Sequence, residues 1–230
     1  MKKYLKFVLL SLIFTPTFGQ NKLTKQEEKN GWQLLFDGST LNNWRTYKNA
    51  QLNWEAVNGE LHNKNHDASE AFRGDLITTK KYKDFVFTCE WKISEAGNSG
   101  IIYRASEEFK QPYFTGPEYQ VADNEGYKGK ITPLQTTASN YDMEGNFLAK
   151  PKPVGLWNST KILVNGNHVE HWLNDVLVIQ YEFNSEKWLE QKEKSKWKTA
   201  LKYGLEPEGH ISLQDHGHEV WFKNVKIKEL

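Results

Sequence analysis

The apolar side chains of this chain alternate with polar ones along short segments that are separated by turn-forming residues. In "DFVFTCEWKIS" the odd-numbered positions from Phe85 to Trp91 fall on one face of an extended strand, and the even-numbered positions fall on the other. The pair Asn58-Gly59 stands between two such segments, where it favours a two-residue hairpin. Because turn signals recur about every 8–12 residues, the pattern predicts an all-β sandwich or jelly roll rather than a parallel α/β fold.

Two segments depart from this strand pattern. Between residues 184 and 204, Trp188, Leu189 and Lys192 lie near helical spacing, and Gly204 is suited to end a helix. We therefore expect one helix of about two or three turns as a short insertion between strands. The segment 126–155 is long for a loop in a compact domain, and loops of such length are usually functional or partly disordered.

The N-terminus has the pattern of an export signal. Lys2, Lys3 and Lys6 precede an apolar run over residues 7–14, and small residues follow before Gln20. We expect a signal peptide over 1–19, a polar tether over 20–30 and a single jelly-roll domain over 31–230. The protein would then be periplasmic or secreted, and it would have no membrane attachment after the signal is cleaved.

The charge balance excludes one class of partner. Removing the signal peptide takes away three lysines and leaves 27 basic and 29 acidic residues, a net charge of −2. This balance lacks the basic excess typical of nucleic-acid binding, so no nucleic-acid partner is expected. The chain also has no G-x-S-x-G motif, no P-loop and no dinucleotide fingerprint. Its one cysteine, Cys89, cannot form a disulfide within the chain and is expected to be a buried thiol.

Polar side chains gather on one face of the strand predicted in "GPEYQVAD". Glu118 and Gln120 point to this face, Tyr119 points to the other, and Asp123 follows just beyond the strand. A carboxylate and an amide on one face suit a sugar ligand, whose hydroxyl groups both donate and accept hydrogen bonds. An exposed polar sheet face without a ligand explains this segment equally well.

Two more residues have both a functional and a structural interpretation. Arg104 in "NSGIIYR" shares a predicted face with Gly100 and Ile102, from which it could bind a ligand oxygen or form a surface salt bridge. His171 lies in an apolar row with Val169. A histidine in such a row is usually a hydrogen-bonded core residue, but its titration near neutral pH keeps a catalytic role open.

The segment "GHISLQDHGHEVWF" places three histidines in a strand-like sequence. Its alternation gives an apolar row and, on the opposite face, a polar row made of His210, Ser212, Gln214 and His216. A metal site needs three or four converging ligands, and a regular strand turns Asp215 away from His216, so we assign no metal ligands. We expect Gln214 and His216 to hold a hydroxyl-rich ligand instead. Farther along, the apolar pattern shifts its phase, which predicts a bulge near Lys223-Asn224.

Five segments in this order resemble the 3-keto-disaccharide hydrolase domain family. They are "GWQLLFDGSTLNNW" (31–44), "NSGIIYR" (98–104), "GPEYQVAD" (116–123), "GLWNSTKILVNGNHVEHWLN" (155–174) and "GHISLQDHGHEVWFKNVKIKEL" (209–230). The resemblance implies a concanavalin A-like jelly-roll sandwich with a ligand groove on its concave sheet. It also implies an exported enzyme that acts on an oxidised carbohydrate. Two departures from the family pattern are Asp175 in a turn and "TTASNYDMEG" in the loop expected to shape the ligand pocket.

The resemblance suggests a mechanism for a 3-keto-glycoside substrate. The ketone acidifies the C2 hydrogen, so a base could remove it, the C1 substituent could leave by elimination, and water could then add. We expect Glu118 or His216 to act as base or acid. The catalytic candidates are Glu118, His216, Asp123 and His171. The substrate-binding candidates are Arg104, Gln120, Gln214, Trp157 and Asn158. No cofactor is firmly implied, although a divalent metal at the ketone could replace a protein donor.

Two other functions fit the same residues. Glu118 and Asp123 could be the carboxyl pair of a conventional glycoside hydrolase, which requires a separation of about 5–10 Å. A sandwich of this class also supports binding without catalysis, so a carbohydrate-binding module is the second alternative.

Overall fold

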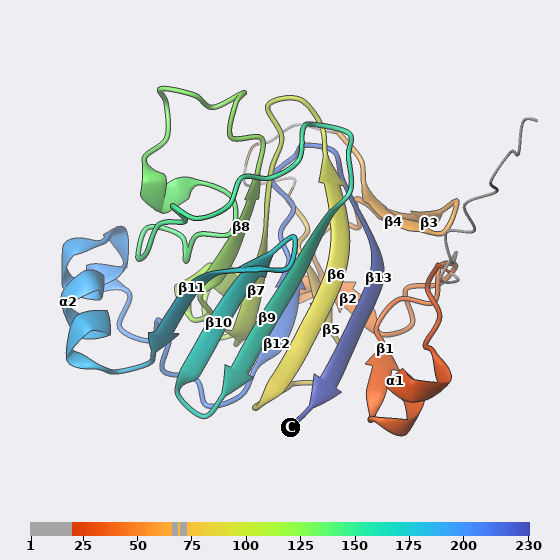
Figure 1. The fold of residues 1–230 in the computed structure, drawn as a ribbon, viewed down its shortest axis with the longest axis horizontal. Helices are drawn as coiled ribbons and strands as arrows, with labels where there is room; N and C mark the ends of the chain where they lie inside the picture. Colours follow the sequence, from red (N-terminus) through yellow and green to blue (C-terminus); the bar gives the residue numbers. More distant parts are fainter. Residues whose placement is uncertain (1–19, 66–68, 70–72) are drawn as a thin grey trace, which may run out of the picture.

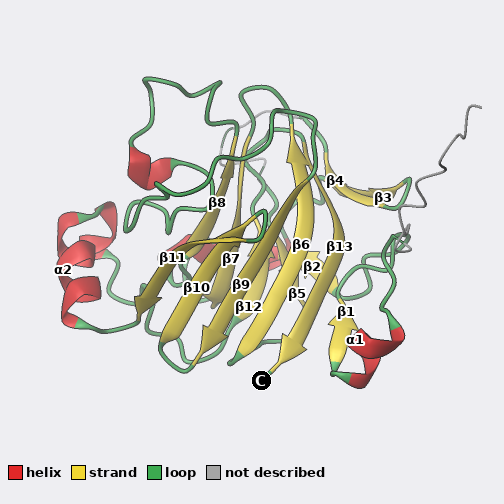
Figure 2. Cartoon of the chain, in the orientation of Figure 1, coloured by secondary structure: helices red, strands yellow, loops and turns green. Residues whose placement is uncertain are grey.

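Two antiparallel β-sheets face each other in the computed structural model, which describes residues 20–65, 69 and 73–230 (Figure 1). The signal peptide predicted over 1–19 lies outside the described residues. Figure 2 shows that strands dominate and that the helices lie at the margins of the sheets. The expected all-β sandwich with one short helical insertion is confirmed.

The larger sheet forms the front layer in Figure 1. In the described part of the chain it has eight strands, in the order β11-β10-β9-β6-β13-β4-β3, with β1 also paired to β13. In chain order these strands are β1 (Trp32–Leu34), β3 (Trp54–Val57), β4 (Glu60–Asn63), β6 (Phe85–Ile93), β9 (Asn158–Asn165), β10 (His168–Leu173), β11 (Val176–Glu182) and β13 (Val220–Glu229).

The smaller sheet lies behind it and has five described strands in the order β2-β5-β12-β7-β8. These are β2 (Trp44–Thr46), β5 (Leu76–Thr78), β7 (Asn98–Ala105), β8 (Glu118–Ala122) and β12 (His210–Leu213). Neighbours in this sheet come from distant parts of the sequence, because β12 lies between β5 and β7. The sheet therefore brings residues from four segments to one surface.

The core fills the space between the two sheets. Alternate residues of β6 from Phe85 to Ile93 are buried, as the sequence pattern predicts, and Tyr119 and Val121 of β8 face them from the smaller sheet. Cys89 is a free, buried thiol within this core. Burial of such large side chains contributes roughly 1.5–3 kcal/mol each and fixes which face of every strand points inward.

The hairpin and the bulge expected from the sequence are both present. Asn58 and Gly59 adopt positive φ angles of 53° and 76° between β3 and β4, as a tight two-residue turn requires. The pairing of β13 with β6 shifts between Lys223 and Lys226, and Asn224 adopts a φ of 49°. The backbone N–H and side-chain oxygen of Asn224 make reciprocal hydrogen bonds with Asn21, which joins the N-terminal segment to the larger sheet.

The helices are short and peripheral. A capping box made by Thr24 and Glu27 begins α1 (Lys25–Lys29), and Ser185 caps α2 (Glu186–Lys194), the predicted insertion. The 3-10 helices are η1 (Tyr47–Asn49), η3 (Pro112–Phe114), η4 (Pro133–Gln135) and η5 (Lys196–Thr199). Across the described residues, every helix is too short or too polar to span a membrane.

Loops cover the outer face of the smaller sheet, the face turned away from the core. The segment 138–141 hydrogen-bonds to the edge of β8, and the backbone of Gly204 donates to Thr115. All five residues of β8 are buried, on both faces. The idea that the polar face of β8 is an exposed sheet surface is therefore wrong, because the sequence pattern of the strand says nothing about what covers it.

Candidate active site

Glu118 lies on the outer face of β8 and reaches across the neighbouring strand. A methyl group at Gly100 of β7 would lie 2.2 Å from the Glu118 carboxyl oxygen Oε1, so the glycine makes room for this side chain. Burial raises the pKa of Glu118 to about 7, although the positive charge of Lys196 and a hydrogen bond with the Gln214 side chain both lower it. A carboxyl group with such a pKa can exchange a proton near neutral pH.

A second buried carboxyl group, that of Asp75, comes from the residue before β5. The backbone N–H of Asp215 donates to its Oδ1 at 2.8 Å, and its Oδ2 has no hydrogen-bond partner among the described residues. Burial raises the pKa of Asp75 to about 8, and the negative charges of Asp215 and Glu118 add to this rise. At neutral pH Asp75 is therefore mostly protonated. The sequence around β5 does not indicate that Asp75 belongs to a site, because only the pairing of β5 with β12 brings it there.

Lys196, the first residue of η5, is a charged neighbour of Glu118. Its Nζ is 4.1 Å from the ring centre of Tyr141 and 4.3 Å from that of Trp197. Burial lowers the pKa of Lys196, while the negative charges of Glu118 and Asp142 act in the opposite direction. Although the residue as a whole is exposed, its ammonium group is partly desolvated against the two rings, so it gives up a proton more easily than a lysine in water. Because η5 is about 80 residues from β8 in the sequence, strand patterns alone could not identify it.

Several buried polar atoms on this outer face have no protein partner. Among the described residues they include Asp75 Oδ2, Ser212 Oγ and Gln120 Oε1. Such atoms are rare in folded proteins because an unmade buried hydrogen bond is costly, so a ligand or ordered water is expected there. A polar pocket of about 490 Å³ opens beside Asp75 and is lined by Tyr47, Lys48, Ala50, Arg73, Lys110 and Gln111.

The predicted residues Glu118, Gln120 and Gln214 lie together on this face, as alternation along β8 and β12 indicated. His216 follows at the turn after β12, where its ring stacks on His218 at 5.5 Å. Burial lowers the pKa of His216 to about 4, and the positive charge of Arg73 lowers it further. His216 is therefore neutral at physiological pH.

In the described part of the chain, no group of three or more His, Cys, Asp or Glu side chains could share a metal ion.

Asp215, which alternation turns away from His216, shapes the turn after β12 as an ionised acceptor. Its carboxylate accepts hydrogen bonds from the side chains of Asn53 and Asn63 and from the backbone N–H groups of Gly74 and Gly217, at 2.7–2.9 Å. These bonds fix the end of β12 against the segment that carries Asp75. Asp215 therefore supports the site without facing it.

Asp123 lies away from Glu118. It accepts a hydrogen bond from the backbone N–H of Ala96 at 2.9 Å and so fixes the turn between β6 and β7. Five residues along an extended strand span about 16 Å, which exceeds the carboxyl separation of either kind of conventional glycosidase. The structure thus does not bring Glu118 and Asp123 together as a carboxyl pair.

Arg104 does not share a face with Gly100 and Ile102, so this prediction is wrong. Between His210 and Ser212 the pairing of β12 with β7 shifts by one residue, and Arg104 adopts a φ of 51° in the resulting bulge. The guanidinium group is turned away from the outer face and donates to the carbonyl oxygens of Lys83 and Gly166. Arg104 holds together the loops at one end of the sandwich.

His171 lies in the core between the two sheets. Its Nδ1 donates to the Ala138 carbonyl at 3.1 Å, and its Nε2 accepts from the Tyr103 hydroxyl at 2.8 Å. Burial lowers its pKa to about 4, so the ring is neutral. The interpretation as a hydrogen-bonded core residue is confirmed, and the side chain is separated from Glu118 by the smaller sheet.

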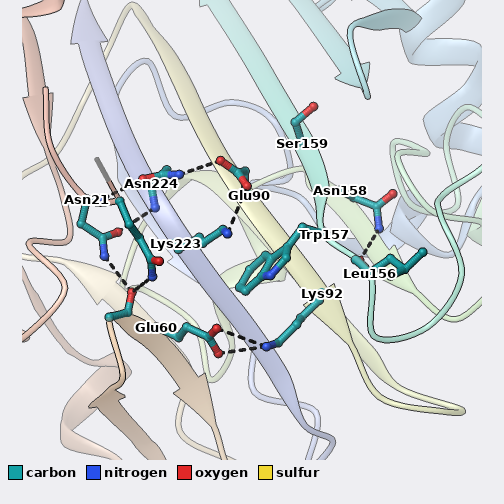
Figure 3. A network of polar contacts seen from close by, with 12 residues as sticks. Asn21, Glu60, Glu90, Lys92, Leu156, Trp157, Asn158, Ser159, Lys223 and Asn224 are labelled. Carbon is teal, nitrogen blue, oxygen red and sulfur yellow. Dashed lines mark hydrogen bonds and ion pairs between the residues drawn. The ribbon is translucent and has the colours of Figure 1, made fainter. Parts of the chain in front are cut away.

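Asn158 begins β9 of the larger sheet and Trp157 directly precedes it, whereas Glu118 belongs to the smaller sheet. Figure 3 shows Trp157 beside Lys92 and Lys223 of the larger sheet. The ammonium groups of Lys92 and Lys223 lie 4.6 and 4.1 Å from the ring centre of Trp157. The Asn158 side-chain oxygen accepts from the backbone N–H of Lys152 at 2.7 Å. Both residues thus organise the loop before β9, and the structure does not place them with Gln120 and Gln214.

Comparison with known proteins adds independent information. A family model described as 3-keto-alpha-glucoside-1,2-lyase-like domain matches residues 31–228. The chain is 35% identical over 232 residues to the 3-keto-disaccharide hydrolase of Bacteroides thetaiotaomicron, with 88% of this chain and 80% of that protein covered. A solved structure of a candidate glycosyl hydrolase from Parabacteroides distasonis has a TM-score of 0.85 at 35% identity, over 92% of this chain and 100% of that one. A second from that organism, at 24% identity and a TM-score of 0.68, covers 87% of this chain and 100% of that one and supports the fold.

Proposed function

Because the chain belongs to the 3-keto-alpha-glucoside-1,2-lyase-like domain family, whose members act on glycosides, we propose that it cleaves 3-keto-glycosides by elimination followed by hydration. The observation that carries this proposal is the pair of buried carboxyl groups, Glu118 and Asp75, on one loop-covered sheet face. Their pKa values, raised by burial to about 7 and about 8, suit one ionised and one protonated partner near neutral pH.

Glu118 is the base of this mechanism. Its ionised carboxylate removes the proton from C2, which the ketone at C3 acidifies, and the electron pair moves to the C3 oxygen to form an enolate. Gln214 hydrogen-bonds to the carboxylate and orients it. Gly100 is required beneath it because any side chain there would displace the carboxyl group.

Asp75 stabilises the enolate. A protonated carboxyl group can donate a hydrogen bond to the developing charge on the C3 oxygen, and its Oδ2 is the oxygen without a partner among the described residues. Burial and the nearby negative charges of Asp215 and Glu118 keep the Asp75 carboxyl group neutral. Ser212 and Gln120 offer further groups for the sugar hydroxyls.

Lys196 is the acid. When the enolate collapses, the C1–oxygen bond breaks, and the ammonium group of Lys196 gives a proton to the departing oxygen. Water then adds at C1 and returns a proton to Lys196, while Glu118 returns its proton to C2; the net reaction consumes one water. Glu118 interacts electrostatically with both Asp75 and Lys196, so we assign C2 of the substrate to Glu118, C3 to Asp75 and C1 to Lys196.

The sequence also supports a location for this activity. The predicted signal peptide favours export, so we propose that the protein meets its carbohydrate substrate in the periplasm or outside the cell.

The test measures alcohol release from a 3-keto-glucoside and from the corresponding unoxidised glucoside. We expect cleavage of the keto substrate alone, with slower release when C2 carries deuterium and with exchange of the C2 hydrogen in heavy water. Equal cleavage of both substrates would point to a conventional glycoside hydrolase. Tight binding without cleavage, in protein supplied with divalent metals, would identify a carbohydrate-binding module and overturn the proposal.

A further inference from the structure

An aromatic pocket of about 470 Å³ adjoins the proposed site on the side of Lys196. It lies between η3 and the segment that follows α2. Its lining is mainly apolar and includes Phe109, Tyr113, Phe114, Trp197, Ala200 and Leu201, with Lys196 as its charged corner. Phe114 and Leu201 are 36% and 79% exposed, so the pocket opens to solvent through these two side chains.

The inner wall of this pocket is held rigidly. Trp197 stacks on Tyr203 with ring centres 4.7 Å apart, and Tyr203 stacks in turn on Trp188. The indole N–H of Trp197 donates to the Tyr141 carbonyl at 2.9 Å, so the ring cannot turn freely. A fixed aromatic wall binds a flat group without paying much conformational entropy.

Lys196 connects this pocket to the reacting centre. Its ammonium group faces the rings of Tyr141 and Trp197, and the charges of Lys196 and Glu118 influence each other. A group bound in the aromatic pocket is therefore next to the residue that would protonate the departing oxygen. The polar pocket beside Asp75 is separate and shares no lining residue with the aromatic one.

The two pockets differ in chemistry. The one beside Asp75 presents hydroxyl, amide and charged groups, which suit the hydroxyls of a sugar ring, whereas the one beside Lys196 presents rings and methyl groups. A second sugar unit can stack one ring face on these aromatic side chains, but its hydroxyl groups find few hydrogen-bond partners in the lining, whereas a flat apolar alcohol needs none.

We infer that the aromatic pocket binds the leaving group, and that the preferred substrates are 3-keto-glycosides of flat, largely apolar alcohols rather than 3-keto-disaccharides. This inference rests on the proposed function, because it assigns the leaving-group side of the same reaction. It makes Phe114 and Leu201 specificity-determining residues.

The test compares benzyl and methyl 3-keto-glucosides of the same anomeric configuration, whose leaving alcohols are similarly basic, together with a 3-keto-disaccharide. We expect kcat/KM to favour the benzyl substrate over the methyl one by about 10- to 100-fold, and to favour it over the disaccharide as well. In the variants Phe114→Ala and Leu201→Ala the ratio of benzyl to methyl should fall several-fold. Leu189→Ala, an exposed position on α2 outside the pocket, should leave the ratio unchanged.

A benzyl-to-methyl ratio near one, a preference for the disaccharide, or ratios unchanged by both pocket variants would overturn the inference. Because Leu201 is largely exposed, its variant remains informative if Phe114→Ala does not fold. If no keto substrate is cleaved, the proposed function fails, and the pocket is then judged by calorimetry with the same two glucosides. Stronger binding of the benzyl compound, weakened by Leu201→Ala, would support the pocket; equal binding would reject it.

Discussion

The outer faces of the two sheets are both rich in charged residues, yet they differ in how those charges are held. On the larger sheet Lys92 pairs with Glu60 at 3.0 Å, and Lys223 lies 3.5 Å from Glu90 (Figure 3). On the smaller sheet, loops bury Glu118 and Asp75, and burial raises the pKa of each. Half-buried ion pairs of the first kind stay charged and contribute little to stability, whereas buried acids of the second kind can exchange protons near neutral pH. Loop cover therefore distinguishes the reactive face from the structural one.

The largest expected effect is on catalysis by Glu118. Replacing it with Gln keeps its shape but removes the base, so kcat/KM for a 3-keto-glucoside should fall by about 10²- to 10⁴-fold. Glu90→Gln, on the outer face of the larger sheet, should leave kcat/KM unchanged. Steady-state kinetics and circular dichroism on both variants check this, and equal activity of the two would remove Glu118 from the mechanism.

Two lysines that contact tryptophan rings permit a second matched comparison. Lys196→Met keeps the aliphatic chain between Tyr141 and Trp197 but removes the proposed acid. We expect kcat for an alkyl 3-keto-glucoside to fall by about 10²-fold, and to fall less for a nitrophenyl 3-keto-glucoside, whose leaving group needs no proton. Lys223→Met, whose ammonium group lies over Trp157, should change neither value. A loss that is the same for both leaving groups would contradict the role as an acid.

Hydrogen bonds to the Asp215 carboxylate fix the end of β12 in the smaller sheet, and a substitution at Asp215 measures how much they stabilise the fold. Asp215→Asn turns an acceptor of four hydrogen bonds into a side chain with one accepting oxygen, so the free energy of unfolding should fall by about 2–3 kcal/mol. Burial alone would raise the pKa of Asp215, but hydrogen bonds from Asn53 and Asn63 lower it below its ordinary value. Its contribution is therefore present above the unfolded pKa and lost as pH falls through the folded one.

Urea unfolding at neutral and acidic pH checks both parts of that expectation. The difference between wild type and Asp215→Asn should shrink in acid. Asp175→Asn, in an exposed turn of the larger sheet where Asn also tolerates positive φ, should change stability by less than about 0.5 kcal/mol. Similar losses in both variants would show that the buried carboxylate has no special role.

The last comparison concerns the pH dependence of stability at Asp75. Because the folded protein holds a proton there up to about pH 8, whereas the unfolded chain loses it near its ordinary pKa, wild-type stability should decline as pH rises between these values. Asp75→Asn removes this slope, so it should gain stability relative to wild type from about pH 5 to about pH 8.

The exposed Asp37 provides a control of opposite sign. Hydrogen bonds, first from the Thr40 hydroxyl, lower the pKa of Asp37 to about 2. Asp37→Asn should therefore differ most from wild type above the ordinary aspartate pKa and converge with it in acid. Urea unfolding of all three proteins across this pH range checks both expectations. If the free energy of unfolding of Asp75→Asn declined with pH as steeply as that of wild type, the account of Asp75 would be contradicted.

Local patterns predicted much of the fold. Alternation placed Tyr119 in the core and Glu118 on the outer face, helical spacing located α2, and a shift of phase located the bulge at Asn224. These features depend on residues a few positions apart, so a short window of sequence contains the necessary information. The prediction for Arg104 is wrong because its bulge depends on pairing with β12, a strand about 100 residues away.

The candidate site was only partly predictable for the same reason. Gln214 and Gln120 emerged from alternation, but Asp75 and Lys196 come from segments with no pattern of their own. Trp157 followed a motif of the family, but it directly precedes β9 of the larger sheet. Which distant residues meet is decided by strand order and loop packing.

By itself, the sequence determined that this chain forms an all-β sandwich, which side chains enter its core, and which family it resembles. Only the tertiary structure decided which of the two polar sheet faces is covered by loops and which carboxyl groups are desolvated. Alternation is a property of neighbouring residues, whereas desolvation depends on everything that packs above a side chain. For that reason the strand that carries Glu118 reveals its polar face, and the whole fold is needed to make that face reactive.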